Sequence, residues 1–210
     1  NPLNAIMVIS DALSQEFGDK MDVRPFINNI RTQVNRLSEL TKDLLDLGKS
    51  KEVSEFRLLN FADLCSAAAH LWGQSGATMG SQIKLALHPE TDNIMVTGDE
   101  QKLQQAILNL LDNAAQNGPN GSVIDVVVER PKSYIARVRV VDRGRGITPD
   151  LMQKVFEPFF TTRKQGTGLG LTIVKSIVES HGGNIIAFNN DPPIGCTMQV
   201  SLPVTEEEGE

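Results

Sequence analysis

The spacing of hydrophobic residues predicts that the chain begins with two helices. Apolar residues first recur at helical spacing at Leu3, Ile6, Met7, Leu13 and Phe17. The polar stretch "GDKMD" interrupts this pattern and predicts a turn. A longer apolar stripe then runs from Val23 to Leu47 and predicts a helix of about seven turns that ends near Gly48. Residues 1–50 are therefore expected to form an all-α helical hairpin.

The apolar face of this hairpin is wider than two helices can cover between them. A second copy of the same chain would cover it most simply, in a dimeric four-helix bundle. The alternative is that the hairpin docks on the rest of its own chain. We expect a homodimer that forms through the hairpin.

The pattern changes after the charged stretch "GKSKEVSEF", which marks a domain boundary near residues 48–55. Helical periodicity returns at about residues 62–79, 100–116 and 169–181. Strands are predicted in "FRLLNF", "IKLAL", "NIMVTG", "SVIDVVVER", "YIARVRVVD", "NIIAFNN" and "GCTMQVSLP". The short turn "PKS" joins two of these runs as a hairpin, so we expect a mainly antiparallel sheet. Residues 51–210 are predicted to form an α+β two-layer sandwich.

Composition narrows the classes of function. The 20 Lys and Arg residues against 26 Asp and Glu give a net charge of −6, which argues against nucleic acid as a partner. Cys65 and Cys196 lack the spacing of a zinc site or a disulfide framework, which favours a reducing compartment. No apolar run approaches the roughly 18 residues of a membrane span. We expect a cytoplasmic segment without membrane contact, whether or not upstream sequence of the full-length protein carries a membrane anchor.

Two asparagines interrupt the Leu-rich helix predicted at residues 100–116. Asn109 and Asn113 lie four residues apart in "NLLDNAAQN", so they share one face of the helix. Asparagine is a mediocre helix former, and its amide oxygen is a hard ligand suited to Mg²⁺. The plain alternative is two exposed polar residues.

A first glycine loop follows one of the predicted strands. In "VVDRGRGI", Asp142 precedes Gly144 and Gly146, and glycines permit the close approach of a ligand. A carboxylate at this place can accept hydrogen bonds from an exocyclic amine. A tight turn without a ligand explains the same residues.

A second glycine loop leads into the last predicted helix. In "KQGTGLGLTIVKSIV", Gly166, Gly168 and Gly170 come just before the helix N-terminus, which favours a bound phosphate. A flexible hinge is the alternative. The stretch "VFEPFFTTRKQ" between the loops combines aromatic residues with Arg163 and Lys164, and it predicts a mobile lid.

The order of these motifs closely resembles the ATP-binding domain of sensor histidine kinases. Their N, G1, F and G2 boxes all appear, in order, within residues 109–170. That domain belongs to the ATPase and kinase superfamily with the Bergerat fold. The hairpin is then similar to the dimerisation and histidine-phosphotransfer domain of the same kinases, so the resemblance covers nearly the whole chain. It implies an ATP-dependent protein-histidine kinase of a two-component system, which passes phosphate to an aspartate of a response-regulator receiver domain.

The resemblance also implies roles for the residues that match these boxes. Asn113 would coordinate Mg²⁺ together with the ATP phosphates, and Asn109 would support it. Asp142 would receive the adenine amine, beside a wall shaped by Gly144 and Gly146. Nucleotide contacts of the second loop would come from Gly166, Thr167, Gly168, Leu169 and Gly170, and the lid would be anchored by the packing of Phe156, Phe159 and Phe160.

One position departs from the family pattern. Many relatives carry a basic residue three positions after the second asparagine, where this chain has Gln116. Phosphate contact must then come from elsewhere, and Arg163 and Lys164 are the candidates. The short lid "FFTTRKQGTGLGL" is similar to that of nitrogen-regulation-type kinases.

Two other functions compete with the kinase interpretation. ATP hydrolases of the superfamily typically place a glutamate where Asn109 stands, and an amide cannot take a proton from water. A dimeric scaffold that binds ATP without chemistry would not need the full set of motifs. Both are less well supported than a histidine kinase.

None of the three histidines is assigned as the phosphoacceptor. His70 is predicted on a domain helix, His88 at a strand end, and His181 at a helix C-terminus, where a cation is favoured. The acceptor motif of the family reads H-E-x-x-N-P-L, or has Thr in place of Asn. "NPL" at residues 1–3 then places the acceptor histidine upstream of residue 1. We expect a chain that binds ATP and Mg²⁺ but does not phosphorylate itself, with Asn1 orienting a water that dephosphorylates the regulator.

Overall fold

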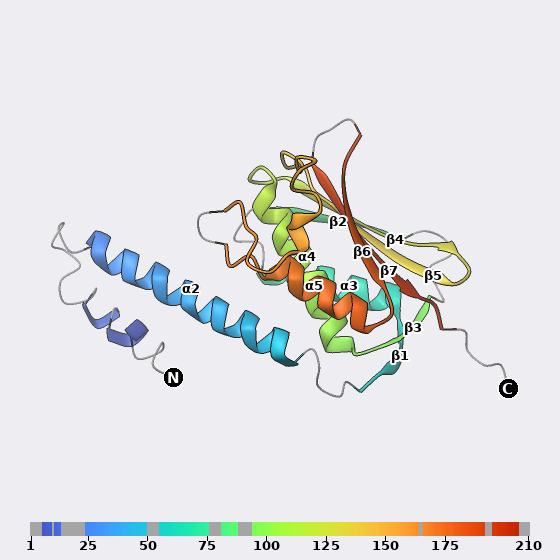
Figure 1. Cartoon of the computed structure of the whole chain (residues 1–210), viewed down its shortest axis with the longest axis horizontal. Helices are drawn as coiled ribbons and strands as arrows, with labels where there is room; N and C mark the ends of the chain where they lie inside the picture. Colours follow the sequence, from blue (N-terminus) through green and yellow to red (C-terminus); the bar gives the residue numbers. More distant parts are fainter. Residues whose placement is uncertain are drawn as a thin grey trace.

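The computed structural model describes residues 6–9, 11–13, 24–49, 55–75, 81–87, 94–163, 166–191 and 195–205. A long helix, α2 (Arg24–Lys49), extends from one side of an α+β domain (Figure 1). Residues 6–9 and 11–13 are helical as predicted, and Asp11 forms an ion pair with Arg31 of α2. The remainder of the predicted first helix lies outside the described residues.

The α+β domain contains the three predicted helices and all seven predicted strands. Their bounds are β1 (Arg57–Asn60), α3 (Phe61–Ser75), β2 (Gln82–Leu87), β3 (Met95–Gly98), α4 (Glu100–Asn117), β4 (Val123–Lys132), β5 (Ile135–Val141), α5 (Gly170–Ser180), β6 (Asn184–Asn189) and β7 (Cys196–Pro203). A short 3₁₀ helix, η2 (Lys154–Phe156), lies in the predicted lid and was not expected from the sequence. The α+β sandwich is therefore confirmed, with α3, α4 and α5 stacked on one face of the sheet (Figure 1).

The sheet is mixed rather than purely antiparallel. Its strand order is β2-β4-β5-β7-β6, and β2 runs parallel to β4 whereas the other neighbours are antiparallel. The reason is the connection between β2 and β4, which passes through β3 and α4, since parallel strands require such a crossover. β1 and β3 pair with each other as a separate two-stranded ribbon.

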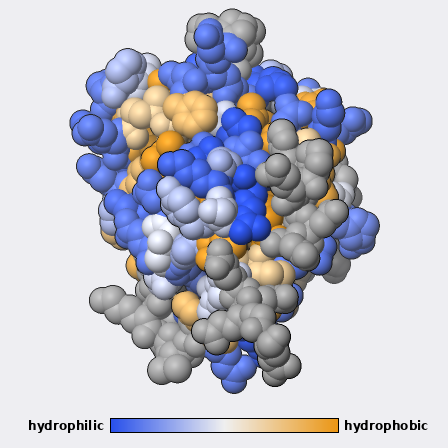
Figure 2. All heavy atoms as spheres, turned by 90° about the vertical axis from the view of Figure 1, so that its right-hand side faces the viewer, coloured by the Kyte–Doolittle hydropathy of each residue, from blue (hydrophilic) through white to orange (hydrophobic). Residues whose placement is uncertain are grey.

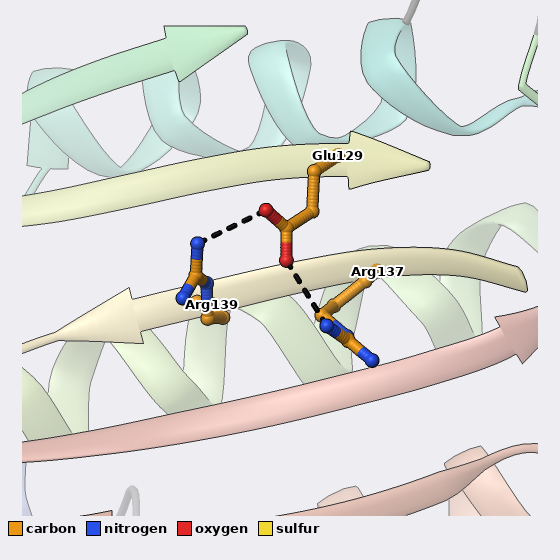
Figure 3. A network of polar contacts seen from close by, with 3 residues as sticks. All are labelled: Glu129, Arg137 and Arg139. Atoms are coloured by element: carbon orange, nitrogen blue, oxygen red, sulfur yellow. Dashed lines mark hydrogen bonds and ion pairs between the residues drawn. The ribbon is translucent and has the colours of Figure 1, made fainter. Parts of the chain in front are cut away.

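The central strands separate an apolar from a polar face because their side chains alternate. Residues of β4 and β5 that face the helices are fully buried, and they are Ile124, Val126, Val128, Ala136, Val138 and Val140. On the opposite face Glu129 binds two arginines, with 3.2 Å to Arg137 and 3.0 Å to Arg139 (Figure 3). The helices therefore cover one face of the sheet, and charged side chains of the central strands lie on the other.

The apolar side chains of α2 are only partly covered. Ile27 and Val34 are buried, and Leu40 packs against the core of the α+β domain. Exposed apolar side chains remain on α2 at Phe26, Ile30, Leu37, Leu44 and Leu45. By contrast, the face of the molecule at the right of Figure 1 is mainly hydrophilic, with separate hydrophobic patches (Figure 2). None of the helices in the described ranges is both long and apolar enough to span a bilayer.

His181 joins three segments that are distant in sequence. Its Nε2 accepts a hydrogen bond from the backbone N–H of Asp99 at 2.9 Å, and Nδ1 lies 2.7 Å from the carbonyl oxygen of Ile177. The imidazole also stacks on Phe56, with 4.8 Å between the ring centroids. Nδ1 must carry the proton to bind a carbonyl, and Nε2 must lack one to accept from Asp99, so the ring is neutral. The prediction of a site that favours a cation is therefore wrong, because burial outweighs the helix terminus.

This neutral histidine predicts a stability that depends on pH. Burial lowers the pKa of His181 from its ordinary value of 6.5, partly opposed by Ile177 and Asp99 and reinforced by Lys102. At a pH near this pKa, His181 is therefore protonated more readily in the unfolded chain than in the folded one. The contribution of the neutral ring to the free energy of unfolding is complete above about pH 6.5 and is lost as the pH falls. In urea unfolding between pH 7.5 and 5.5, His181→Gln should lose less stability than the wild type. His70→Gln, at an exposed histidine, should follow the wild type, and an unchanged pH dependence in His181→Gln would contradict the assignment.

Candidate functional site

Two loops meet the C-terminal half of α4 and form a polar site with it. They are the loop that follows β5 and the loop that precedes α5, and α4 itself contributes Asn109 and Asn113. Arg163, at the end of the lid, binds Asn113, and Gly144 of the loop after β5 packs on the backbone of Asn117. The structure thus brings together the motifs that the sequence singled out, although their roles toward a ligand stay predictions.

Asp142 is a buried carboxylate with one oxygen committed to the fold. Its Oδ1 accepts hydrogen bonds from the backbone N–H of Gly144 at 2.7 Å and of Cys196 at 3.1 Å. Among the described residues, no hydrogen bond goes to Oδ2. Burial raises the pKa of Asp142, opposed by these two N–H groups and by the charges of Arg143 and Arg163. Oδ2 is not one of the fully buried side-chain atoms that lack a partner, so it can be reached from outside the protein and can accept a hydrogen bond from a ligand.

Gly144 and Gly146 shape the loop that starts at Asp142. A Cβ on Gly144 would lie 2.6 Å from the carbonyl oxygen of Asn117, so only glycine lets the loop approach α4 this closely. Gly146 has a φ of 75° and lies beside the side chain of Asn189. Both glycines therefore lie in the tight loop that starts at Asp142, and their role as a wall of an adenine site stays a prediction.

Asn113 is bound by the lid arginine in this structure. Nη2 of Arg163 donates to the Asn113 side-chain oxygen at 3.1 Å and to its backbone oxygen at 3.2 Å. Nη1 of Arg163 donates to the side-chain oxygen of Gln116, and Asn117 also donates to Asn113 Oδ1 at 3.1 Å. The oxygen that the resemblance assigns to Mg²⁺ therefore holds a guanidinium, which a metal ion would have to replace.

Some of the remaining polar candidates lie within the described residues and others do not. Asn109 is half-buried on α4, one turn before Asn113. Burial, together with the charge of Arg145, lowers the pKa of Arg163, although Asp142 acts in the opposite direction. Lys164 and Asn1 lie outside the described residues, and so does His88.

The second glycine loop turns tightly against the lid before α5 begins. Gly168 has a φ of 71°, and a Cβ there would lie 2.5 Å from the backbone of Phe159, so glycine is required. Thr167 accepts a hydrogen bond from the N–H of Leu169 at 3.3 Å, and the Leu169 side chain is fully buried. Gly166 packs on the Thr161 side chain, whereas Gly170 has open space where a Cβ would stand. A nucleotide contact at Gly170 therefore stays a prediction.

One of the three lid phenylalanines packs against the core as predicted. Phe156 packs against the core and its carbonyl oxygen accepts a hydrogen bond from Thr172 at 3.3 Å, while Phe160 is half-buried. Phe159 is 61% exposed, so the prediction that it anchors the lid by packing is wrong. The reason is its backbone, which takes a left-handed turn with a φ of 64° against Gly168.

Two residues beside the site were missed in the sequence. Asn189, the last residue of β6, and Asn190, which follows it, both contact the Asp142 loop. Their only signal is a pair of asparagines before "DPPIG", which is typical of any turn. Nothing local could connect them with a residue that lies almost fifty positions earlier.

Comparisons with known proteins support the resemblance. Residues 98–206 match the family described as histidine kinase-, DNA gyrase B-, and HSP90-like ATPase, which implies ATP binding. Residues 1–52 match the His Kinase A (phospho-acceptor) domain. The sensor-like histidine kinase SenX3 of Mycolicibacterium smegmatis is 32% identical over 209 residues, which are 96% of this chain and 54% of that protein. Sporulation kinase A of Bacillus subtilis is 29% identical over 178 residues, 85% of this chain and 29% of its own length.

Solved structures agree with the observed fold. The catalytic domain of histidine kinase ThkA superposes with a TM-score of 0.64 at 30% identity, over 72% of this chain and 97% of its own. ThkA in complex with the response regulator TrrA superposes with a TM-score of 0.73 at 27% identity, over 100% of this chain and 59% of that one. The chain spans between 29% and 54% of the two curated relatives named above.

Proposed function

Because the chain belongs to the sensor histidine kinases of two-component systems, we propose that it transfers the γ-phosphoryl group of ATP to a histidine side chain. The phosphoryl group then passes to an aspartate on the receiver domain of a response regulator. The observation that carries this proposal is the buried Asp142, whose Oδ2 has no hydrogen bond among the described residues, close to α4 and the two glycine loops. The two family matches correspond to the two parts that such a reaction requires, an ATP-binding domain and a phospho-acceptor domain.

Asp142 is proposed to select the adenine base. The exocyclic amine of adenine is a donor, and Oδ2 is the acceptor available to it. Gly144 keeps side-chain atoms out of the space between this loop and α4. The base would therefore be oriented by one carboxylate that the fold already holds in position.

Asn113 is proposed to hold Mg²⁺ through its amide oxygen. Among the described residues, no three His, Cys, Asp or Glu side chains form a metal site, so the other ligands would be nucleotide phosphates and water. A bound Mg²⁺ neutralises phosphate charge. Arg163 would leave the amide oxygen when the metal binds, and its guanidinium would then be free to bind the phosphates beside the start of α5.

The acceptor is proposed to be none of the histidines in this sequence. The match to the phospho-acceptor domain, residues 1–52, contains no histidine. His181 is committed to the contacts with Asp99, Ile177 and Phe56, and His70 lies on α3 beside Gln74. The phosphatase role of Asn1 stays a prediction.

Homodimerisation is proposed to occur through the helical hairpin. The exposed apolar residues of α2, from Phe26 to Leu45, lie on the part that matches the dimer-forming phospho-acceptor domain. A response regulator is the proposed protein partner, as ThkA was solved with TrrA. The division into residues 1–50 and 51–210 is proposed on the same grounds.

Phosphorylation of the full-length protein tests the proposed function. With radiolabelled ATP and Mg²⁺, it should gain a phosphate that is labile in acid and stable in base, as expected for phosphohistidine. Adding the receiver domain should move the label to that domain. Asn113→Ala should lose most of the labelling, whereas Asn120→Ala, in the exposed turn after α4, should keep it. Release of free phosphate alone, without a labelled protein, would favour ATP hydrolysis and overturn the proposal.

A further inference from the structure

Two consecutive asparagines at the end of β6 hold both ends of the loop that carries Asp142. At one end, the Asn190 side-chain amide donates to the backbone oxygen of Asp142 at 3.0 Å. At the other end, Asn189 accepts from the N–H of Ile147 at 2.8 Å and donates to the Ile147 carbonyl oxygen at 2.8 Å. The loop of residues 142–147 is therefore clamped by two adjacent amide side chains.

The Asn190 side chain is itself fixed from a second side. Its oxygen accepts a hydrogen bond from the Thr197 hydroxyl at 2.6 Å, and Thr197 is buried in β7. The backbone N–H of Asn190 donates to the carbonyl oxygen of Gly195 at 3.2 Å. An amide that is held at both its oxygen and its nitrogen has one orientation, so the contact with Asp142 is rigid.

The next strand, β7, fixes the rest of Asp142. The backbone N–H of Asp142 donates to the carbonyl oxygen of Cys196 at 2.9 Å, and the N–H of Cys196 donates back to Oδ1 at 3.1 Å. Together with Asn190, these bonds restrain the N–H, the C=O and one carboxylate oxygen of Asp142. The remaining oxygen, Oδ2, therefore has a defined position.

We propose that Asn190, aligned by Thr197, is a positioning residue that determines the preference of this site for a 6-aminopurine over a 6-oxopurine. This inference rests on the proposed function, in which Asp142 receives the exocyclic amine. A 6-oxopurine presents a lone pair where adenine presents a donor, so a fixed carboxylate repels it. A carboxylate that could turn aside would reject it less, because specificity of this kind depends on polar groups that cannot escape an unpaired state.

Calorimetric titration with ADP and IDP tests this inference, because the two nucleotides differ only at the 6-position and the adjacent N1 of the base and share their phosphates. The ratio of the two affinities isolates the contact with the base, which general damage to the fold does not change selectively. Removing the neutral hydrogen bond in Asn190→Ala should lower the ADP preference about five- to tenfold. Thr197→Val, which keeps the shape of Thr197 but removes its hydroxyl, should lower it about two- to fivefold.

Two reference variants separate the possible outcomes. Asp142→Asn should abolish the preference, and Asn184→Ala, at the exposed start of β6, should leave it at the wild-type ratio. If Asp142→Asn loses the preference while Asn190→Ala and Thr197→Val both keep it, the inference is wrong and the assignment of Asp142 stands. If Asp142→Asn keeps the preference, the adenine assignment fails and the inference falls with it. Should Asn190→Ala not fold, as judged by its thermal transition, Thr197→Val decides the question.

Discussion

Replacement of Asp142 by asparagine is expected to weaken ATP binding by about ten- to a hundredfold, the effect of losing a hydrogen bond to a charged group. The side-chain oxygen that remains still accepts from Gly144 and Cys196, so the loop should keep its shape. The new amide nitrogen would take the place of Oδ2 and point a donor at the donor of the base. Affinity should therefore fall while the melting temperature changes little.

Calorimetry with ATP and Mg²⁺ measures this effect directly. Asp150→Asn is the matched control, because Asp150 is an exposed acid in the segment between β5 and α5. It removes the same charge without touching Asp142. Equal affinities of the wild type and Asp142→Asn would contradict the assignment of the adenine contact.

Replacement of Arg163 by alanine is expected to weaken ATP binding about tenfold, and AMP binding much less, because a cation near the phosphates is lost. Adding Gln116→Arg to this variant should restore most of the affinity. The side chain of Gln116 already contacts the Arg163 guanidinium, so an arginine on α4 would deliver its charge to the same place. The chain would then carry its cation where many relatives carry theirs.

Binding of ATP and AMP to the wild type, Arg163→Ala and the double variant separates this role from its alternative. Arg57→Ala is the control, because Arg57 is an exposed arginine of β1 that pairs with Glu55 and contacts neither α4 nor the lid in any described hydrogen bond. If Arg163 mainly competes with Mg²⁺ for the Asn113 oxygen, its removal would strengthen ATP binding. That result, or a double variant as weak as Arg163→Ala, would sink the proposed role.

The elements that the sequence predicted best are those with a local signal. Helix α4 was expected at residues 100–116 and spans Glu100–Asn117, because Asp99 caps it and its apolar residues repeat at helical spacing. The parallel pairing of β2 with β4 was missed because "IKLAL" has no feature that specifies its neighbour. Whether two strands pair in parallel depends on the segment that connects them, and the sequence of one strand carries no information about that.

The site was predicted in its motifs and missed in its contacts. Asn113 and Asp142 were singled out because their motifs stand in a recognisable order, and their roles stay predictions. The hydrogen bonds of Arg163 to Asn113 and of Asn190 to Asp142 join residues 50 and 48 positions apart. At such separations only the fold decides which side chains meet. The prediction that His181 favours a cation was wrong for the same reason, because its burial depends on tertiary contacts.

The position of β7 in the sheet determines when the α+β domain can finish folding during translation. β7 lies between β5 and β6, and the residues after it reach back, with Thr205 bound to Met95 at 2.8 Å and to Thr97 at 2.9 Å. The Asp99 contact that starts α4 also waits for His181. During translation α2, α3 and α4 are therefore made well before the strand that closes their sheet. A nascent chain shorter than about residue 205 exposes the edges of β5 and β6, and chaperones would be most needed in that interval.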